Sequence, residues 1–273
     1  MKLATRLCAW ALGLTLSAAT LAADTDYTLA ISEGTSGGID HARVLAKYGT
    51  FADALGKALK GKVRIVFARE FALLEEGLAQ QRFDLALARP SDYPARALRD
   101  HGYRFVASAA PEGQCLIVVR KDSPLQNVAE AKGKRWVLPE QASYMSKFCR
   151  AELRDRGILI DKEKVQYVRE QGAVKFFLEQ NLVDVGGVAS YSGVARGLEK
   201  SNLRVLHRSV TQPYFPLVAG PRLSDEQLKA IQAELIAMPQ SAAGRDVLEQ
   251  IGVQGFDTST GPRLANLLDW LTR

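Results

Sequence analysis

The chain has 273 residues, of which 47% are hydrophobic and 24% charged, and its net charge at pH 7 is +6. This length and composition are typical of a globular protein with one large domain or two lobes of about 100–150 residues each. No run of Lys and Arg with interleaved aromatic residues is present, which argues against nucleic acid as a partner; the mild positive charge is weak evidence for an anionic ligand.

The first 23 residues have the pattern of a secretory signal peptide. Lys2 and Arg6 precede an apolar run from Leu7 to Leu16, and small residues around Ala22 and Ala23 offer a cleavage site. The run is shorter than the roughly 20 apolar residues of a spanning helix, although an uncleaved anchor is the alternative. Cleavage would remove two positive charges and lower the net charge from +6 to +4.

Strand-like and helix-like segments alternate along the rest of the chain. Strands are predicted at 27–32, 62–68, 83–88, 103–110, 115–124, 135–139, 165–170, 183–190, 203–210 and 214–220. Helices are predicted at 42–59, 71–81, 142–157, 173–181, 191–200, 224–238, 242–251 and 262–273, with Gly61 ending the first and Ser143 capping the third.

Strands separated by helices of this length predict βαβ units and mainly parallel sheets. Two such units are expected, joined by chain crossings near residues 110–117 and 208–214. The fold class is therefore α/β, with two lobes around a central ligand cleft. Lobe 1 is predicted to comprise residues 24–112 and 211–273, and lobe 2 residues 113–210.

A polar cluster follows the buried strand that ends at Ala88, at Arg89, Ser91, Asp92 and Tyr93. In open parallel sheets, ligands bind at the carboxyl ends of the strands, so this cluster is in the right place to hold one. Tyr93 can donate to an oxyanion and Arg89 can act as a charged clamp, or Tyr93 can simply pack under the next helix. Glu33 ends the first strand, before a Gly-rich loop whose amides could form an anion nest.

Several segments, taken in order, resemble the periplasmic binding proteins of the phosphate, phosphite and phosphonate uptake group. They are "KYGTFADALGKALKGKVRI", "LLEEGLAQQRFDLALARPSDY", "VVRKDSPLQNVAEAKGKRWVL", "PEQASYMSKFCRAELRDRGI" and "VDVGGVAS". The resemblance implies a type 2 periplasmic-binding-protein fold. It also implies an exported protein that closes on a small oxyanion and delivers it to an inner-membrane ABC permease.

The resemblance implies ligand contacts at the turn that opens the helix at 142–157, from Gln141, Ser143 and Tyr144. A helix N-terminus suits an anion because its first amides are free and carry partial positive charge. The other expected contacts are Ser91, Tyr93, Glu33, Arg89, Gln171, Ser190 and Tyr191.

The chain also departs from the family pattern. Gln171 stands where the family commonly has a histidine, and Ala189, Ser190 and Tyr191 occupy positions that can carry a carboxylate in binders of amino-phosphonates. A cationic amino group would find fewer partners here, which favours a small neutral or anionic oxo-species.

Cys115 and Cys149 leave three alternatives open: a disulfide, two buried thiols, or a thiol with a chemical role. The last underlies a second functional hypothesis, a periplasmic sensor of a species such as arsenite that signals through the ectodomain of a membrane histidine kinase.

The three histidines, His41, His101 and His207, match no zinc motif, and neither a G-x-S-x-G elbow nor a Cys-x-x-Cys pair occurs. We therefore expect no metal, no cofactor and no enzymatic activity, and take a monomer as the default state.

Overall fold

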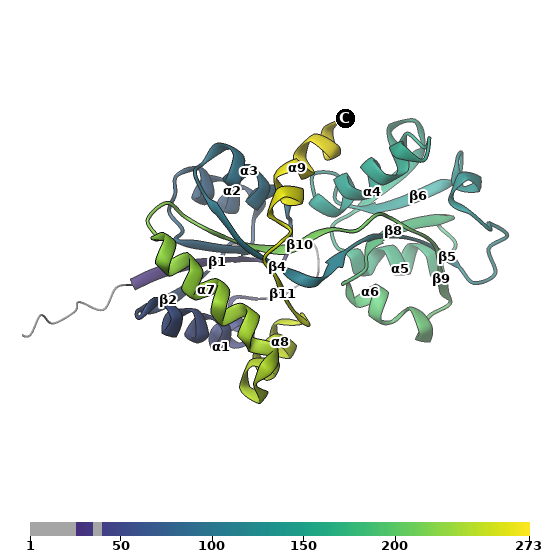
Figure 1. The fold of residues 1–273 in the computed structure, drawn as a ribbon. Helices are drawn as coiled ribbons and strands as arrows, with labels where there is room; N and C mark the ends of the chain where they lie inside the picture. The colour runs from purple at the N-terminus through teal and green to yellow at the C-terminus, as the bar shows by residue number, and fades with distance from the viewer. Residues whose placement is uncertain (1–25, 35–39) are drawn as a thin grey trace, which may run out of the picture.

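The computed structural model describes residues 26–34 and 40–273. The predicted signal peptide and most of the Gly-rich loop after Glu33 lie outside the described residues. Two mixed sheets organise the fold, and they lie side by side with helices on their faces (Figure 1). We call the six-stranded sheet with its helices lobe 1 and the five-stranded sheet with its helices lobe 2. The limits of the two lobes along the chain stay a prediction.

The sheet of lobe 1 has the strand order β11-β4-β10-β3-β1-β2. Its strands are β1 (Asp26–Ser32), β2 (Lys62–Phe67), β3 (Leu85–Ala88), β4 (Arg104–Gly113), β10 (Gln212–Ala219) and β11 (Gly255–Asp257). β1 pairs in parallel with β2 and β3, whereas β10 is antiparallel to β3 and β4. β3 is buried along its whole length, as expected for a short apolar strand in the middle of a sheet.

The sheet of lobe 2 has the order β7-β6-β8-β5-β9. Its strands are β5 (Cys115–Arg120), β6 (Arg135–Pro139), β7 (Lys164–Val168), β8 (Val185–Ala189) and β9 (Leu203–Arg208). β6 runs parallel to β7 and β8, and β5 is antiparallel to β8 and β9. The parallel pairings lie within the βαβ units, and the strands that lead from one lobe to the other pair antiparallel.

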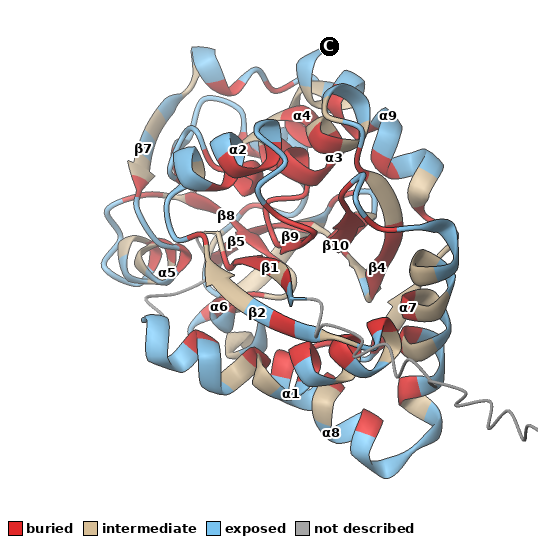
Figure 2. Ribbon diagram, turned by 90° about the vertical axis from the view of Figure 1, so that its left-hand side faces the viewer, coloured by how far each residue is buried: buried red, intermediate tan, exposed pale blue. Residues whose placement is uncertain are grey.

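Helices cover both sheets, and the longest of them, α1, buries an apolar stripe (Figure 2). They are α1 (His41–Leu59), α2 (Phe71–Ala79), α3 (Asp92–Asp100), α4 (Tyr144–Asp155), α5 (Gln171–Glu179), α6 (Gly193–Arg196), α7 (Asp225–Ala237), α8 (Ala242–Ile251) and α9 (Gly261–Thr272). Short 3-10 turns are η1 (Val128–Ala131), η2 (Ile160–Lys162), η3 (Leu198–Lys200) and η4 (Met238–Gln240). α3 and β11 were not anticipated from the sequence, and the helix expected at 191–200 is split into α6 and η3.

The helix α9 joins the two lobes. It packs against α3 in lobe 1 and α4 in lobe 2, and lies between them in Figure 1. Its residues Leu264, Leu267 and Leu268 belong to the same buried cluster as the lobe 2 side chain Trp136. The two lobes therefore share part of one core in addition to their two chain crossings.

Candidate functional site

The candidate site lies between the lobes, where the ends of β1 and β3 face the N-termini of α4 and α5. A cavity of about 10 Å³ is lined there by Glu33, Gly34, Phe71, Arg89, Pro90, Ser143, Tyr144, Met145, Gln171 and Tyr191. This is about the room that a single water molecule needs. A larger ligand therefore requires the two lobes to move apart.

Six of the ten residues predicted from the sequence line this cavity: Glu33, Arg89, Ser143, Tyr144, Gln171 and Tyr191. The other four lie outside its wall. The buried Ser91 hydroxyl donates to the carbonyl of Pro213 at 3.0 Å, and Ser190 accepts from the amide of Gln114 at 3.1 Å. Gln141 is exposed. Tyr93 is buried and stacks on Phe71 with ring centroids 5.7 Å apart, so it supports the cavity wall from behind.

Glu33, directly after β1, is the centre of a buried ionic network. Its carboxylate is 6% exposed and accepts from the Arg89 guanidinium, the Tyr48 hydroxyl and, at 2.7 Å, the Lys47 ammonium. Burial by itself raises the pKa of Glu33. The charges of Arg89 and Lys47 and the hydrogen bonds outweigh burial and lower the pKa to about 2. The carboxylate is thus ionised at any physiological pH.

Arg89, directly after β3, is surrounded by aromatic rings. Its guanidinium carbon lies 4.4 Å from the ring centroid of Phe215, 5.3 Å from that of Tyr214 and 5.8 Å from that of Tyr191. Phe215 adopts a φ of 49°, in the left-handed region that a bulky residue rarely enters, at a bulge of β10. Such strain persists only where the surrounding packing enforces it, and here the bulge brings two rings to Arg89.

The guanidinium of Arg89 still has donors to offer. Its Nε bonds to Glu33, and one Nη2 hydrogen points at the carbonyl of Ile251 at 3.4 Å. Arginine has five N–H donors, so Arg89 can bind an oxyanion without releasing Glu33.

Lobe 2 contributes the N-terminus of α4. Ser143 caps this helix by accepting from the amide of Ser146 at 3.3 Å, and its own hydroxyl hydrogen remains able to donate. The Tyr144 hydroxyl is buried without a hydrogen bond of normal geometry, close to Ser91. Burial raises the pKa of Tyr144 well above its usual value, so the hydroxyl stays protonated and can donate.

Gln171 and Tyr191 complete the wall from lobe 2. Gln171 begins α5, and its Oε1 accepts from the amide of Ala189 at 2.6 Å, which ties α5 to the end of β8. Tyr191 stacks on Tyr214 with ring centroids 3.8 Å apart. Burial raises the pKa of Tyr191, so its hydroxyl also stays protonated.

Six residues at this site were not predicted from the sequence: the lining residues Phe71, Met145, Gly34 and Pro90 and, behind them, Lys47 and Tyr48. Only their positions relative to the predicted strands and helices could have pointed to them. Phe71 opens the helix after β2, and Lys47 and Tyr48 lie about two turns into α1, on the side that faces the end of β1.

Cys115 of β5 and Cys149 of α4 form a disulfide, with Cα atoms 5.4 Å apart. Of the three alternatives, the disulfide is correct and the two with free thiols are wrong. The bond ties α4 to the sheet of lobe 2, five residues after Tyr144 on the same helix. It thereby holds the N-terminus of α4 against the lobe that carries it.

Within residues 26–34 and 40–273, no group of His, Cys, Asp and Glu side chains is arranged to hold a metal ion. In the same residues, no helix is long and apolar enough to cross a membrane.

The fold matches solved structures over nearly the whole chain. XAC2383 from Xanthomonas citri, bound to ATP, aligns with a TM-score of 0.72 at 15% identity and covers 91% of this chain and 97% of its own. PhnD1 from Prochlorococcus marinus, in complex with methylphosphonate, aligns with a TM-score of 0.71 at 13% identity and covers 90% of this chain and 96% of its own. A binding protein component of an ABC phosphonate transporter from Pseudomonas aeruginosa aligns with a TM-score of 0.67 at 17% identity. It covers 91% of this chain and 86% of its own. These likenesses confirm the type 2 periplasmic-binding-protein fold.

A comparison with curated proteins finds no match. The family model described as "ABC transporter, phosphonate, periplasmic substrate-binding protein" matches residues 38–262. This span covers most of the chain and includes every lining residue of the cavity except Glu33 and Gly34. The chain therefore belongs to the family of periplasmic substrate-binding proteins of phosphonate ABC transporters.

Proposed function

We propose that this protein binds a small oxyanion of the phosphate, phosphite or phosphonate type between its lobes and delivers it to an ABC permease. One observation carries the proposal: a buried arginine with spare donors faces a helix N-terminus across the cleft. Both groups favour negative charge, and each belongs to a different lobe. An oxyanion held by both would favour the closed arrangement.

The charges around the cavity indicate a ligand with a low negative charge. Arg89 and Lys47 carry two positive charges and Glu33 one negative charge, so the net charge of the three groups is +1. Glu33 stays ionised because its pKa is lowered to about 2, and it would repel a second negative charge on the ligand. We expect a monoanion to bind better than a dianion of the same size.

The ligands named for two similar structures, methylphosphonate and ATP, are both anions that carry phosphorus. They support the class of ligand that we propose here.

Nothing in the described residues favours the alternative of an arsenite sensor coupled to a histidine kinase. Soft trivalent species need thiolate ligands, and the sulfur atoms of Cys115 and Cys149 are bonded to each other. Export through a cleavable signal peptide and a monomeric state remain part of the proposal.

Replacement of Tyr144 by Phe tests the site directly. The Tyr144 hydroxyl lacks a hydrogen bond of normal geometry, so its removal should leave the free energy of unfolding unchanged or slightly higher. If the hydroxyl donates to the ligand, the same change should weaken binding by about 1–3 kcal/mol.

The measurement is isothermal titration calorimetry with phosphate, phosphite, methylphosphonate, aminoethylphosphonate and sulfate. Tyr93→Phe is the matched control, because Tyr93 lies behind Phe71 and outside the cavity wall. Wild-type affinity in Tyr144→Phe for every anion that binds would show that the ligand lies elsewhere. Failure of all five anions to bind the wild-type protein would reject the proposed ligand class.

A further inference from the structure

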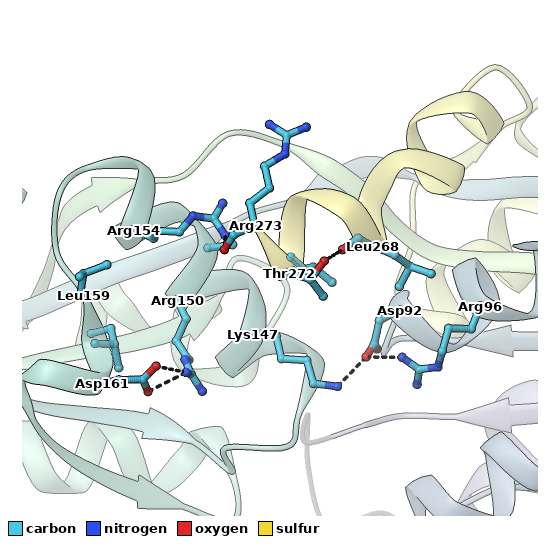
Figure 3. A pocket seen from close by; sticks show the side chains of 13 residues that line it. Asp92, Arg96, Lys147, Arg150, Arg154, Leu159, Asp161, Leu268, Thr272 and Arg273 are labelled. Carbon is cyan, nitrogen blue, oxygen red and sulfur yellow. Dashed lines mark hydrogen bonds and ion pairs between the residues drawn. The ribbon is translucent and has the colours of Figure 1, made fainter.

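A second cavity lies between α3, α4, η2 and α9 (Figure 3). We call it the α4 pocket. Its volume is about 450 Å³, which falls within the range of about 300–1,000 Å³ typical of small-molecule sites. The cleft cavity shares no lining residue with it.

The α4 pocket is cationic. Its lining side chains carry five positive charges, from Arg96, Lys147, Arg150, Arg154 and Arg273. They carry two negative charges, from Asp92 and Asp161, so the net side-chain charge of the lining is 5 − 2 = +3. Glu75 and Asp155 pair with Arg96 and Arg154 from outside the lining, and counting them lowers the net charge to 5 − 4 = +1.

Three of these cations belong to one face of α4. Lys147, Arg150 and Arg154 recur at spacings of three and four residues, which places them in a row along the helix. Their side chains are 34%, 28% and 22% exposed. Charges that are partly buried in this way are screened less than surface charges and interact more strongly with a ligand.

Arg154 is already engaged, because its guanidinium pairs with Asp155 at 2.8 Å and donates to the carbonyls of Trp270 and Arg273. The ion pairs of the other cations can open more easily. The Arg150 guanidinium pairs with the Asp161 carboxylate at 2.6 Å, but the Asp161 side chain is 67% exposed and can return to water at little cost. Lys147 and Arg96 share a single carboxylate oxygen of Asp92, at 2.8 and 3.4 Å. Arg96 also pairs with Glu75 at 3.3 Å, but the Glu75 side chain is 55% exposed, so an anionic ligand could replace it at little cost.

The floor of the α4 pocket is apolar. Leu159 is 44% exposed and Leu271 is half-buried, whereas the lining residues Ala151 and Leu268 are buried. A bare inorganic anion would leave this surface in water. A ring or a short hydrocarbon group attached to the anion would cover it and gain the free energy of apolar burial.

We propose that the α4 pocket is a second ligand site, separate from the cleft, for a soluble organic phosphate that has at least two negative charges and a ring. Lys147 and Arg150 on α4 hold the phosphate oxygens, and Leu159 and Leu271 hold the ring. This inference does not depend on the proposed function, because the residues that carry it are different.

The position of the α4 pocket gives its occupant a further effect. α3 and α9 pack with lobe 1, whereas α4 and η2 belong to lobe 2, so a bound ligand would contact both. If this ligand and the cleft ligand each prefer one arrangement of the lobes, each changes the protein's affinity for the other by the same factor.

The test is titration of the purified protein with 1-naphthyl phosphate, followed by naphthyl fluorescence, with inorganic phosphate as the ring-free comparison. We expect 1-naphthyl phosphate to bind at least tenfold more tightly than inorganic phosphate, because only the former can cover the leucines. Arg150→Gln should weaken its binding about tenfold, as expected for the loss of a charge-assisted bond.

Arg135→Gln is the matched control. Arg135 also belongs to lobe 2 and pairs with one aspartate, Asp184 at 2.7 Å, but it lies outside the α4 pocket. Its replacement changes the net charge equally and should leave binding within about twofold of wild type. Equal losses of affinity for 1-naphthyl phosphate in both variants would show that net charge alone causes the effect. Unchanged affinity in Arg150→Gln would overturn the proposal.

Two further arms exclude other sources of the signal. Tyr144→Phe should not change the binding of 1-naphthyl phosphate; a loss there would place this ligand in the cleft and overturn the second site. The protein should not co-sediment with phosphatidylglycerol vesicles in a way that depends on Arg150, because a flat membrane cannot enter a cavity. Arg150-dependent sedimentation without binding of 1-naphthyl phosphate would replace the soluble ligand by a lipid surface.

Discussion

The carboxylate of Glu33 and the guanidinium of Arg89 form an ion pair in which both side chains are less than 10% exposed. The two residues directly follow the neighbouring parallel strands β1 and β3, where the register pairs Ser32 with Ala88. The pair is thus produced by strand pairing, and it places a fixed negative charge beside the positive charge that would attract a ligand. Because each charge compensates the other, neither can be removed alone without consequence.

Replacement of Glu33 by Gln should strongly destabilise the protein, because Arg89 would be left buried without its counter-ion. Loss of one partner of a buried pair typically costs about 3–5 kcal/mol. Urea unfolding measures the change. Asp184→Asn, which breaks the exposed pair with Arg135, should cost no more than about 1 kcal/mol. The double variant Glu33→Gln with Arg89→Met should recover part of the lost stability. A double variant that is less stable than Glu33→Gln would contradict this account.

The stability should also depend on pH through Glu33. Its pKa is about 2 in the folded protein and 4.5 in its ordinary state, so the folded form holds the proton less tightly. The stabilisation is therefore complete above pH of about 4.5 and is lost as the pH falls towards 2, by about 3 kcal/mol in all. Urea unfolding between pH 6 and pH 3 should show a shallower pH dependence for Glu33→Gln than for wild type. Parallel curves would assign the acid sensitivity to other carboxylates.

The disulfide between Cys115 and Cys149 should contribute substantially to stability. It joins residues 34 apart in the chain, and a loop of this length is worth about 2–4 kcal/mol. Replacement of both cysteines by Ala should lower the free energy of unfolding by that amount. Dithiothreitol should do the same to wild type and nothing to the double variant. A lowered stability of the double variant in dithiothreitol would point to an effect of the reductant other than reduction of this bond.

Gly187 is required by the packing around this disulfide. A Cβ atom at Gly187 would lie 2.6 Å from Cδ2 of Leu138 and 3.0 Å from the sulfur of Cys149. Gly187→Ala should therefore cost about 1–3 kcal/mol in thermal or urea unfolding. Gly49→Ala in α1 is the control, because no atom lies within 4 Å of its added Cβ. That change should stabilise the helix by about 0.5–1 kcal/mol, and a loss at Gly49 similar to that at Gly187 would discount the packing argument.

The fold could be predicted in large part because its elements have strong local patterns. The apolar stripe of α1, formed by Val44, Tyr48, Phe51 and Leu55, indicates a helix without any long-range information. The apolar run of β3 indicates a strand in the same way. α3 was missed because Pro94 and a cluster of polar residues look like a loop, although proline is tolerated in the first turn of a helix. β11 has three residues and pairs only with β4, so its strand character comes from that pairing.

The candidate site was predicted less completely. Arg89 could be found because topology gathers the ends of parallel strands at one edge of the sheet, and Tyr144 because the turn before α4 resembles the family's. Phe71 and Met145 could not, because an apolar side chain in the wall of a cavity has the same local sequence pattern as one in the core. Nor could the sequence choose between a disulfide and two thiols at Cys115 and Cys149, which depends on the distance between β5 and α4.

The two sheets differ in the part of the chain that each requires. All strands of the five-stranded sheet lie within residues 115–208, whereas the six-stranded sheet needs β10 and β11 in addition to strands from the first third of the chain. A growing or translocating chain can therefore complete lobe 2 while β3 and β4 still lack their partner β10. Non-local strand pairing is slow and leaves edges open to aggregation. We expect folding to proceed from the middle of the sequence outwards, with the last residues closing the first lobe.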